Sequence, residues 1–226
     1  MFERAEFRRH LEAAGIDESH LERLAEFGAM LLEANRRFNL TGAKTAEQLA
    51  PHIVDSLSVA LYVRGPYVDI GSGGGLPAIP LAIVTGAEVT LIESVVKKTV
   101  FLKAALADLG LSGRVIPERA EHVAQDPEFR ERFQSGTARA VSSPSTVAEL
   151  LVPFLALGGR AILQRGAFPQ SERDALADAA MMLGARVSEE RELEGDRRIV
   201  LLEKTEPTPQ RFPRRAGIPE KRPLCT

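Results

Sequence analysis

Between residues 67 and 203 the chain alternates short apolar runs with longer helical segments, and this rhythm constrains the fold most. The pattern predicts strands at 67–70, 88–92, 114–117, 137–141, 160–164, 185–191 and 198–203. Helices are expected in the first five gaps, near 77–84, 95–109, 121–134, 145–155 and 170–183. Because strands that alternate with helices pair in parallel through right-handed crossovers, the sequence predicts a doubly wound α/β sheet.

The two ends of this sheet domain differ from an ordinary dinucleotide fold. The last two predicted strands have only a short turn between them, Glu194 to Asp196, so we expect a terminal antiparallel hairpin there. The first 64 residues are instead helical in pattern. Capping boxes at Ser19-x-x-Glu22 and Thr45-x-x-Gln48 are expected to open the second and third of three helices.

The C-terminal segment is proline-rich and basic. From Lys204 to Thr226 there are six basic residues and two acidic ones, a local charge of +4 in a chain whose net charge is -2. Its prolines predict an extended arm without helices. We therefore expect three parts: a helical extension (1–64), a sheet domain (65–204) and an arm (205–226). The arm is a candidate contact to an acidic partner through Arg211, Arg214 and Arg215, although packing of Phe212 and Ile218 against the sheet is an equal alternative.

The stretch DIGSGGGLP, residues 69 to 77, falls where the first strand ends and a helix begins. Open α/β sheets bind their ligands at this edge. Glycines at 71, 73 and 75 permit positive φ angles and allow a ligand to lie against bare backbone, with Ser72 between them. A flexible surface turn is the alternative, but the flanking strand and helix favour a cofactor loop.

The spacing of these glycines narrows the choice of cofactor. Leu76 occupies the position where a dinucleotide fingerprint has its third glycine, and no Lys-Ser or Lys-Thr pair follows, as a phosphate loop requires. The remaining common cofactor of such a loop is S-adenosylmethionine, which carries no phosphate and so needs neither of these two motifs. Glu93, 22 residues beyond Gly71 at the end of the second strand, is placed to accept hydrogen bonds from ribose hydroxyls. After the third strand, Ala120 and Glu121 are placed to flank an adenine.

Composition excludes several classes of protein. The single cysteine, Cys225, rules out a disulfide framework, and the four histidines are scattered without the spacing of metal ligands. No window approaches the length of a membrane span, and no signal peptide is evident. We therefore expect a cytoplasmic protein without a bound metal or a membrane contact.

Several segments together resemble one family. RRFNLTG, HIVDSL, DIGSGGGLPAIPLAI, KKTVFLKAALADLGL, RAE, ARAV and TPQRFPRRAGIPEKRPL are similar to the RsmG (GidB) family of bacterial methyltransferases. That family acts on a guanine ring nitrogen of small-subunit (16S) ribosomal RNA. The resemblance runs from about residue 20 to the C-terminus. It implies a class I S-adenosylmethionine-dependent methyltransferase (Rossmann-like) sheet with a helical N-terminal extension.

The resemblance also implies roles for individual residues. Gly71, Leu76, Ala120, Glu121 and Arg139 are implied to contact S-adenosylmethionine or to line its pocket. Asn39, His52, Asp55 and Ser56 are implied to lie near the mouth of that pocket. The chain departs from the family pattern at Ala34, at Ala78 and at Gln164 to Gly166, where Arg165 replaces a lysine expected to contact RNA.

The chemistry that the resemblance implies requires no acid or base from the protein. Nitrogen 7 of guanine carries a free lone pair that can attack the sulfonium methyl group without a general base. Catalysis is then mainly the positioning of two reactants, so no catalytic acid or base is assigned. For Arg139 a phosphate or cofactor contact is preferred over a simple salt bridge.

Two other functions stay open at this point. An NAD-dependent oxidoreductase would use the same crevice, but Leu76 and the terminal hairpin count against it. A noncatalytic RNA-binding protein with a nucleotide pocket is opposed by the intact glycine loop and by Glu93. The expected partner is small-subunit ribosomal RNA or the small ribosomal subunit, and a monomer is expected.

Overall fold

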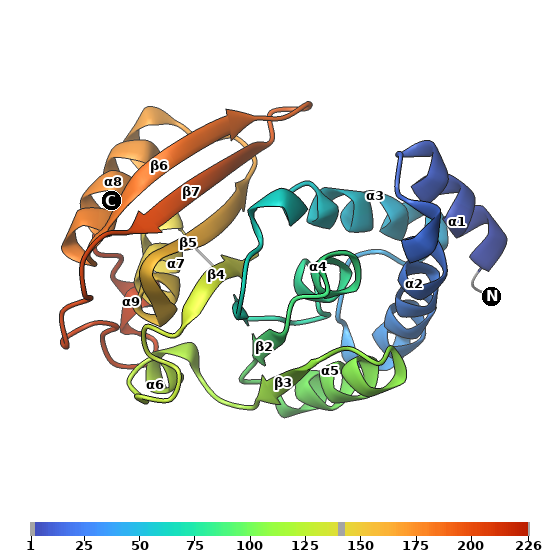
Figure 1. Ribbon diagram of the computed structural model, residues 1–226, viewed down its shortest axis with the longest axis horizontal. Coiled ribbons are helices and arrows are strands. Elements are labelled where there is room, and N and C mark those ends of the chain that lie inside the picture. The colour runs from blue at the N-terminus through green and yellow to red at the C-terminus, as the bar shows by residue number, and fades with distance from the viewer. Residues whose placement is uncertain (1–2, 140–142, 226) are drawn as a thin grey trace.

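A mixed β-sheet forms the centre of the protein in a computed structural model, which describes residues 3–139 and 143–225 (Figure 1). Within these residues the sheet has seven strands in the order β3-β2-β1-β4-β5-β7-β6. The strands are β1 (Tyr67–Ile70), β2 (Val89–Ile92), β3 (Gly113–Ile116), β4 (Phe133–Ala138), β5 (Leu155–Arg165), β6 (Ala185–Glu192) and β7 (Arg198–Lys204). The first five pair in parallel, while β7 runs antiparallel to both β5 and β6. The predicted doubly wound sheet with a terminal hairpin is confirmed.

Helices cover both faces of the sheet because its strands alternate their side chains. Tyr67 of β1 and Leu91 of β2 join the core cluster that includes α4 (Ala78–Thr85) and α5 (Val96–Asp108). Val68 of β1 points the other way, into a cluster with residues of α7 and α8. The helices on that side are α6 (Ala120–Val123), α7 (Pro144–Leu151), the short 3-10 helix η2 (Val152–Phe154) and α8 (Gln170–Met182).

The N-terminal helices extend the first of these two cores. They are α1 (Arg4–Ala13), α2 (Glu18–Phe38) and α3 (Ala46–Leu57), followed by the 3-10 helix η1 (Ala60–Tyr62). They lie at one end of the long axis, with the β6–β7 hairpin at the other (Figure 1). The Thr45 cap is confirmed, because its hydroxyl accepts the Gln48 N–H at 3.2 Å. The cap predicted at Ser19 is wrong: Asp17 caps α2 and accepts the Ser19 N–H at 2.9 Å.

Several element boundaries differ from the sequence prediction. β4 and β5 begin at Phe133 and Leu155, before the predicted starts at 137 and 160, and the helix expected near 145–155 ends at Leu151. The helix expected over 121–134 is only α6, because the chain turns after Val123 and enters β4 at Phe133. The buried side chains of Phe129 and Phe133 explain this, since they pack into the core from a turn and from a strand. The end of the strand predicted at 137–141, residues 140 and 141, lies outside the described residues. The domain boundaries at 64 and 204 stay predictions.

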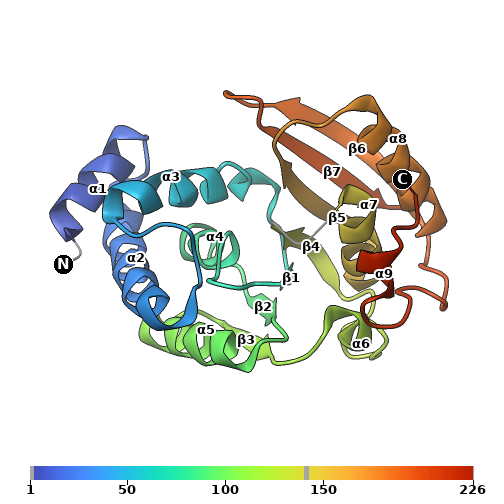
Figure 2. The same ribbon diagram turned by 180° about the vertical axis from the view of Figure 1, so that it is seen from behind.

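The C-terminal arm is docked onto the sheet domain. Phe212 is 3% exposed and belongs to the core around α7, so the packing alternative is confirmed for this residue, while Ile218 is half-buried. The prediction of an arm without helices is wrong, because α9 (Ile218–Lys221) forms beside α7 (Figure 2). No helix in the described parts of the chain is both long and apolar enough to cross a membrane.

Candidate active site

The loop after β1 is held by hydrogen bonds within the sheet edge. Gly71, Gly73 and Gly75 have φ angles of +66°, +53° and +81°, which explains glycine at these three positions. The Ser72 hydroxyl donates to the carbonyl of Asp69 at 3.0 Å, so this side chain stabilises the turn by bonding back to the last residues of β1. The loop is therefore shaped before any ligand arrives.

Two of the glycines are required by the protein itself and not by a ligand. A Cβ atom on Gly74 would lie 2.9 Å from the carbonyl oxygen of Leu40, in the loop that joins α2 to α3. A Cβ atom on Gly75 would lie 2.5 Å from Cδ1 of Ile79 in α4. At Gly73 the nearest atom would be 3.6 Å away, an ordinary contact. Glycine at residues 74 and 75 is thus needed for close packing within the protein, whereas Gly73 has space around it.

A cavity of about 260 Å³ opens beside this loop, at the carboxyl ends of β1 to β4. Five of the eight predicted cofactor-binding residues line it: Gly71, Glu93, Ala120, Glu121 and Arg139. The other three lie outside its lining. Ser72 is buried in the turn, Gly73 donates its N–H to Glu93, and Leu76 packs against the core cluster that the N-terminal helices share with α4 and α5.

Glu93 fixes the shape of the cavity where β2 ends. One carboxylate oxygen accepts the N–H of Gly73 at 2.9 Å, and the other accepts the N–H of Val95 at 2.8 Å. Each carboxylate oxygen has a second acceptor site, so Glu93 keeps the capacity to accept from a ligand hydroxyl. This acid thus links the glycine loop to the second strand and also faces the cavity.

Glu121 is 4% exposed at the start of α6 and is tied to the C-terminal arm. Its carboxylate accepts the N–H of Gly217 at 2.8 Å and a guanidinium N–H of Arg119 at 3.1 Å. Burial alone raises the pKa of Glu121, but the hydrogen bonds from Gly217, from the backbone of Glu121 itself and from Arg119 outweigh burial, and the net pKa is lowered. Glu121 is therefore a charged wall of the cavity.

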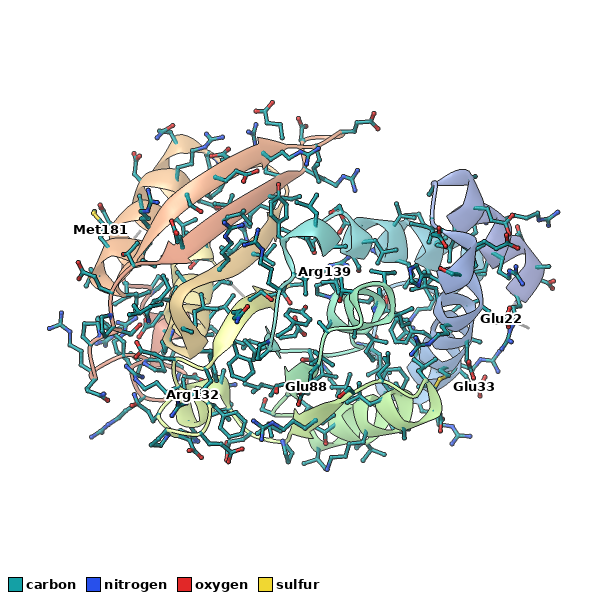
Figure 3. The ribbon with its side chains drawn as sticks, viewed as in Figure 1. Glu22, Glu33, Glu88, Arg132, Arg139 and Met181 are labelled. Atoms are coloured by element: carbon teal, nitrogen blue, oxygen red, sulfur yellow. The ribbon has the colours of Figure 1, made fainter. Side chains whose placement is uncertain are left out.

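Arg139 lies after β4, in the central part of the molecule (Figure 3), and three side chains of α3 contact it. Its guanidinium contacts Nδ1 of His52 at 3.1 Å, donates to the Ser56 hydroxyl at 3.2 Å and lies 3.8 Å from the Asp55 carboxylate. A guanidinium has no acceptor atom, so Nδ1 of His52 must be unprotonated. Burial first, and then the charge of Arg139, lowers the pKa of His52. Arg139 thus brings His52, Asp55 and Ser56 together beside the first cavity, and their implied place at its mouth stays a prediction.

A second cavity, of about 170 Å³, shares Arg139 with the first. Asp55, Gln164 and Arg165 also line it, together with Arg197 and Arg198 from the end of the hairpin. Arg197 pairs with Asp55 at 3.0 Å, and Arg165 pairs with Glu172 at 3.2 Å. The sequence reasoning missed Arg197 and Arg198, whose signal was two adjacent arginines directly after the predicted turn.

The remaining predicted substrate residues lie elsewhere. Asn39 is exposed and ends α2 with a left-handed φ of +51°. The neighbouring Asn35, which the sequence reasoning missed, is buried and shapes the loop: its side chain donates to the carbonyls of Thr41 and Ala43, both at 2.9 Å. In the arm, Arg211 and Arg215 are exposed, whereas Arg214 is engaged by the buried carboxylate of Glu149.

Among the described residues, no group of three or more histidine, cysteine or acidic side chains is arranged to hold a metal ion. The site therefore offers polar and charged protein groups around two adjoining cavities. One cavity is lined by both acids and bases, and the other is dominated by arginine.

Sequence comparison places the chain in a family. A family model described as rRNA small subunit methyltransferase G (GidB) matches residues 20–200. The ribosomal RNA small subunit methyltransferase G of Rubrobacter xylanophilus is 43% identical, over 98% of this chain and 91% of the relative. The protein of the same name from Deinococcus radiodurans is 38% identical, over 96% of this chain and 91% of the relative.

Comparison with solved structures supports the fold. The AdoMet complex of M. jannaschii TYW2 aligns with a TM-score of 0.53 at 16% identity, covering 68% of this chain and 76% of that one. A SAM-dependent O-methyltransferase from Thermotoga maritima aligns with a TM-score of 0.53 at 14% identity, covering 79% of this chain and 72% of that one. Together with the strand order, the comparisons show that the chain belongs to the rRNA small subunit methyltransferase G family and is an rRNA methyltransferase with a class I, Rossmann-like fold.

Proposed function

We propose that this chain transfers a methyl group from S-adenosylmethionine to nitrogen 7 of a guanine in small-subunit (16S) ribosomal RNA, the reaction of its family. The observation that carries the proposal is the pair of adjoining cavities that share Arg139. One cavity lies at the sheet edge where α/β folds bind adenosine ligands. The other presents arginines to a polyanion.

In this proposal the cofactor has one orientation in the first cavity. Its ribose hydroxyls would meet Glu93 at the end of β2, and its adenine would lie beside Ala120 at the end of β3. The methionine end would then lie by Gly71, where the Arg139 guanidinium can pair with its carboxylate. When bound, the cofactor supplies an electrophilic methyl group at its sulfonium.

The target nucleotide would enter through the second cavity. Arg165 and Arg197 can bind phosphate oxygens and so place the base beside Arg139. An arginine that donated to nitrogen 7 would occupy the lone pair that must attack the methyl group, so the guanidinium groups serve phosphate or O6. Since nitrogen 7 carries no proton, positioning of the two reactants supplies most of the catalysis.

The partner in this proposal is small-subunit RNA or the small ribosomal subunit. The exposed Arg211 and Arg215 of the docked arm add candidate phosphate contacts. A monomeric state and a cytoplasmic location stay predictions.

Equilibrium binding separates this proposal from its alternatives. We expect S-adenosylhomocysteine, measured by calorimetry, to bind the full chain, and Glu93→Ala to weaken that binding by about 10- to 100-fold. The matched control is Glu88→Ala, because Glu88 is exposed directly before the other end of β2. Tighter binding of NADH than of S-adenosylhomocysteine would favour an oxidoreductase, and cofactor binding without methyl transfer would favour a noncatalytic RNA-binding protein.

A further inference from the structure

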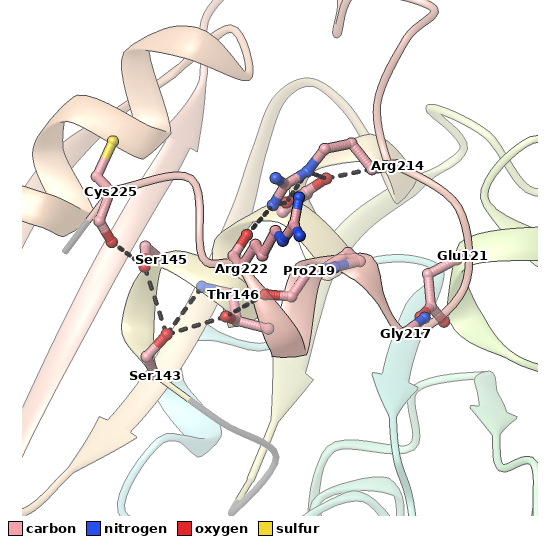
Figure 4. A network of polar contacts seen from close by, with 10 residues as sticks. Glu121, Ser143, Ser145, Thr146, Arg214, Gly217, Pro219, Arg222 and Cys225 are labelled. Atoms are coloured by element: carbon pink, nitrogen blue, oxygen red, sulfur yellow. Dashed lines mark hydrogen bonds and ion pairs between the residues drawn. The ribbon is translucent and has the colours of Figure 1, made fainter.

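The C-terminal arm supplies one wall of the first cavity. Glu220, in α9, lines that cavity together with Thr146 and Leu150 of α7. The arm reaches this place through two hydrogen bonds to the cavity's own residues. The N–H of Gly217 donates to Glu121 at 2.8 Å, and the Thr146 hydroxyl donates to the carbonyl of Pro219 at 3.0 Å (Figure 4).

The arm is fixed in this position by stronger contacts on either side of α9. The guanidinium of Arg214 makes a bidentate pair with Glu149, with one contact of 2.6 Å, and Glu149 is fully buried in α7. Beyond α9, the Ser145 hydroxyl donates to the carbonyl of Cys225 at 2.9 Å (Figure 4). The segment from Gly217 to Glu220 therefore bridges α6 and α7 as a placed wall, and not as a free tail.

Glu220 differs from the other acids of the cavity. Glu93 accepts two backbone N–H groups, Glu118 accepts the N–H of Arg119, and Glu121 accepts the N–H of Gly217. Glu220 has no hydrogen bond or ion pair with any residue that the structure describes, and it is exposed. Its carboxylate is thus an acceptor still available to a ligand.

The position of this wall indicates which part of a ligand it meets. In the cofactor orientation proposed above, on which this inference rests, the ribose lies at Glu93 and the adenine lies beside Ala120. The edge of adenine remote from the ribose then faces α7 and α9. That edge carries the 6-amino group, which donates hydrogen bonds and complements a carboxylate acceptor.

We propose that Glu220 accepts a hydrogen bond from the 6-amino group of the bound cofactor's adenine and thereby gives the site its preference for adenine. The C-terminal arm is then part of the cofactor site. Deletion of the arm is therefore expected to weaken cofactor binding, whereas deletion of an arm that contacted only RNA would leave cofactor binding unchanged. A carboxylate also repels a 6-oxo group, so the same residue discriminates against hypoxanthine.

The test compares S-adenosylhomocysteine with S-inosylhomocysteine, which carries a 6-oxo group in place of the 6-amino group. We expect the full-length parent to bind the adenosyl compound about tenfold tighter or more. Glu220→Gln is expected to reduce this ratio by about tenfold, because a glutamine amide can donate to the 6-oxo oxygen. Glu206→Gln, an exposed acid of the same arm outside the cavity, should keep the parent ratio.

The outcomes separate this inference from the proposed function. If the parent binds S-adenosylhomocysteine and Glu220→Gln keeps the parent ratio within about twofold, the role of Glu220 is refuted while the cofactor site stands. If the parent binds neither compound, the proposed function itself fails. Because Glu220 is exposed and forms no contact that folding requires, its variant is expected to unfold at the temperature of the parent.

Discussion

The ion pair between Arg214 and Glu149 is expected to hold the C-terminal arm in place. Glu149 is fully buried, and its carboxylate receives three contacts from the Arg214 side chain, at 2.8, 3.1 and 2.6 Å. The backbone N–H of Arg214 adds a fourth at 2.9 Å. Arg214→Ala removes the first three and leaves a buried carboxylate with only the backbone donor.

Removing one partner of a buried pair lowers the free energy of unfolding by about 3–5 kcal/mol. The Arg214 side chain is 27% exposed, so water can enter the space that it vacates, and we expect the lower end, about 3 kcal/mol. For a chain of this size that corresponds to a decrease in Tm of about 6–12 °C.

Urea and thermal unfolding followed by circular dichroism measure the effect. Arg215→Ala is the matched control, because Arg215 is the next residue and is exposed, and we expect a change within about 0.5 kcal/mol. If Arg214→Ala unfolds with the stability of Arg215→Ala, the arm is not held by this pair, and the reasoning about the cavity wall loses its support.

Three further predictions concern the loop, the strand beneath it and the second cavity. Gly75→Ala should destabilise the fold by about 2–4 kcal/mol, because the added Cβ atom would lie 2.5 Å from Cδ1 of Ile79, whereas Gly73→Ala should cost only about 1 kcal/mol because its Cβ atom has room. Equal losses of stability for the two variants in urea unfolding would contradict this reasoning. Burial raises the pKa of Asp69 to about 7, so the stability tied to its protonated form is complete below about pH 4 and is lost as the pH rises through 7. The stability of the parent relative to Asp69→Asn should therefore fall by about 3–5 kcal/mol between pH 4 and 8, and a pH-independent difference would show that Asp69 titrates normally. Arg165→Ala should leave the Kd for S-adenosylhomocysteine unchanged and flatten the logarithmic salt dependence of RNA binding by about 0.7–0.9; an unchanged slope would remove Arg165 from the phosphate contacts.

The parts of the fold that sequence predicted correctly rest on local periodicity. The parallel strands, the hairpin after β5 and the Thr45 cap each follow from residues that lie close together in the chain. The position of Glu93 at the cavity also followed from its place at the end of a strand. Such features need no knowledge of distant contacts.

The missed features depend on contacts between distant segments. Gly217 meets Glu121 from 96 residues away, and Arg197 meets Asp55 from 142 residues away. Proline spacing in the arm predicted an extended chain, but burial of Phe212 and the Glu149 pair fix it against α7. Neither contact has a local signature, so the sequence left packing of the arm as one of two alternatives, and the arginine-lined cavity emerged only from the three-dimensional arrangement.

The central claim is that the two adjoining cavities bring the cofactor and a guanine of small-subunit RNA together. The most direct test incubates the purified chain and labelled S-adenosylmethionine with small ribosomal subunits that lack the modification. The methylated nucleotide is then identified by mass spectrometry of nuclease fragments. We predict one label per subunit, on nitrogen 7 of a guanine, and its loss in Glu93→Ala but not in Glu88→Ala. Label on an exocyclic amine or a ribose, or no label despite cofactor binding, would contradict the account.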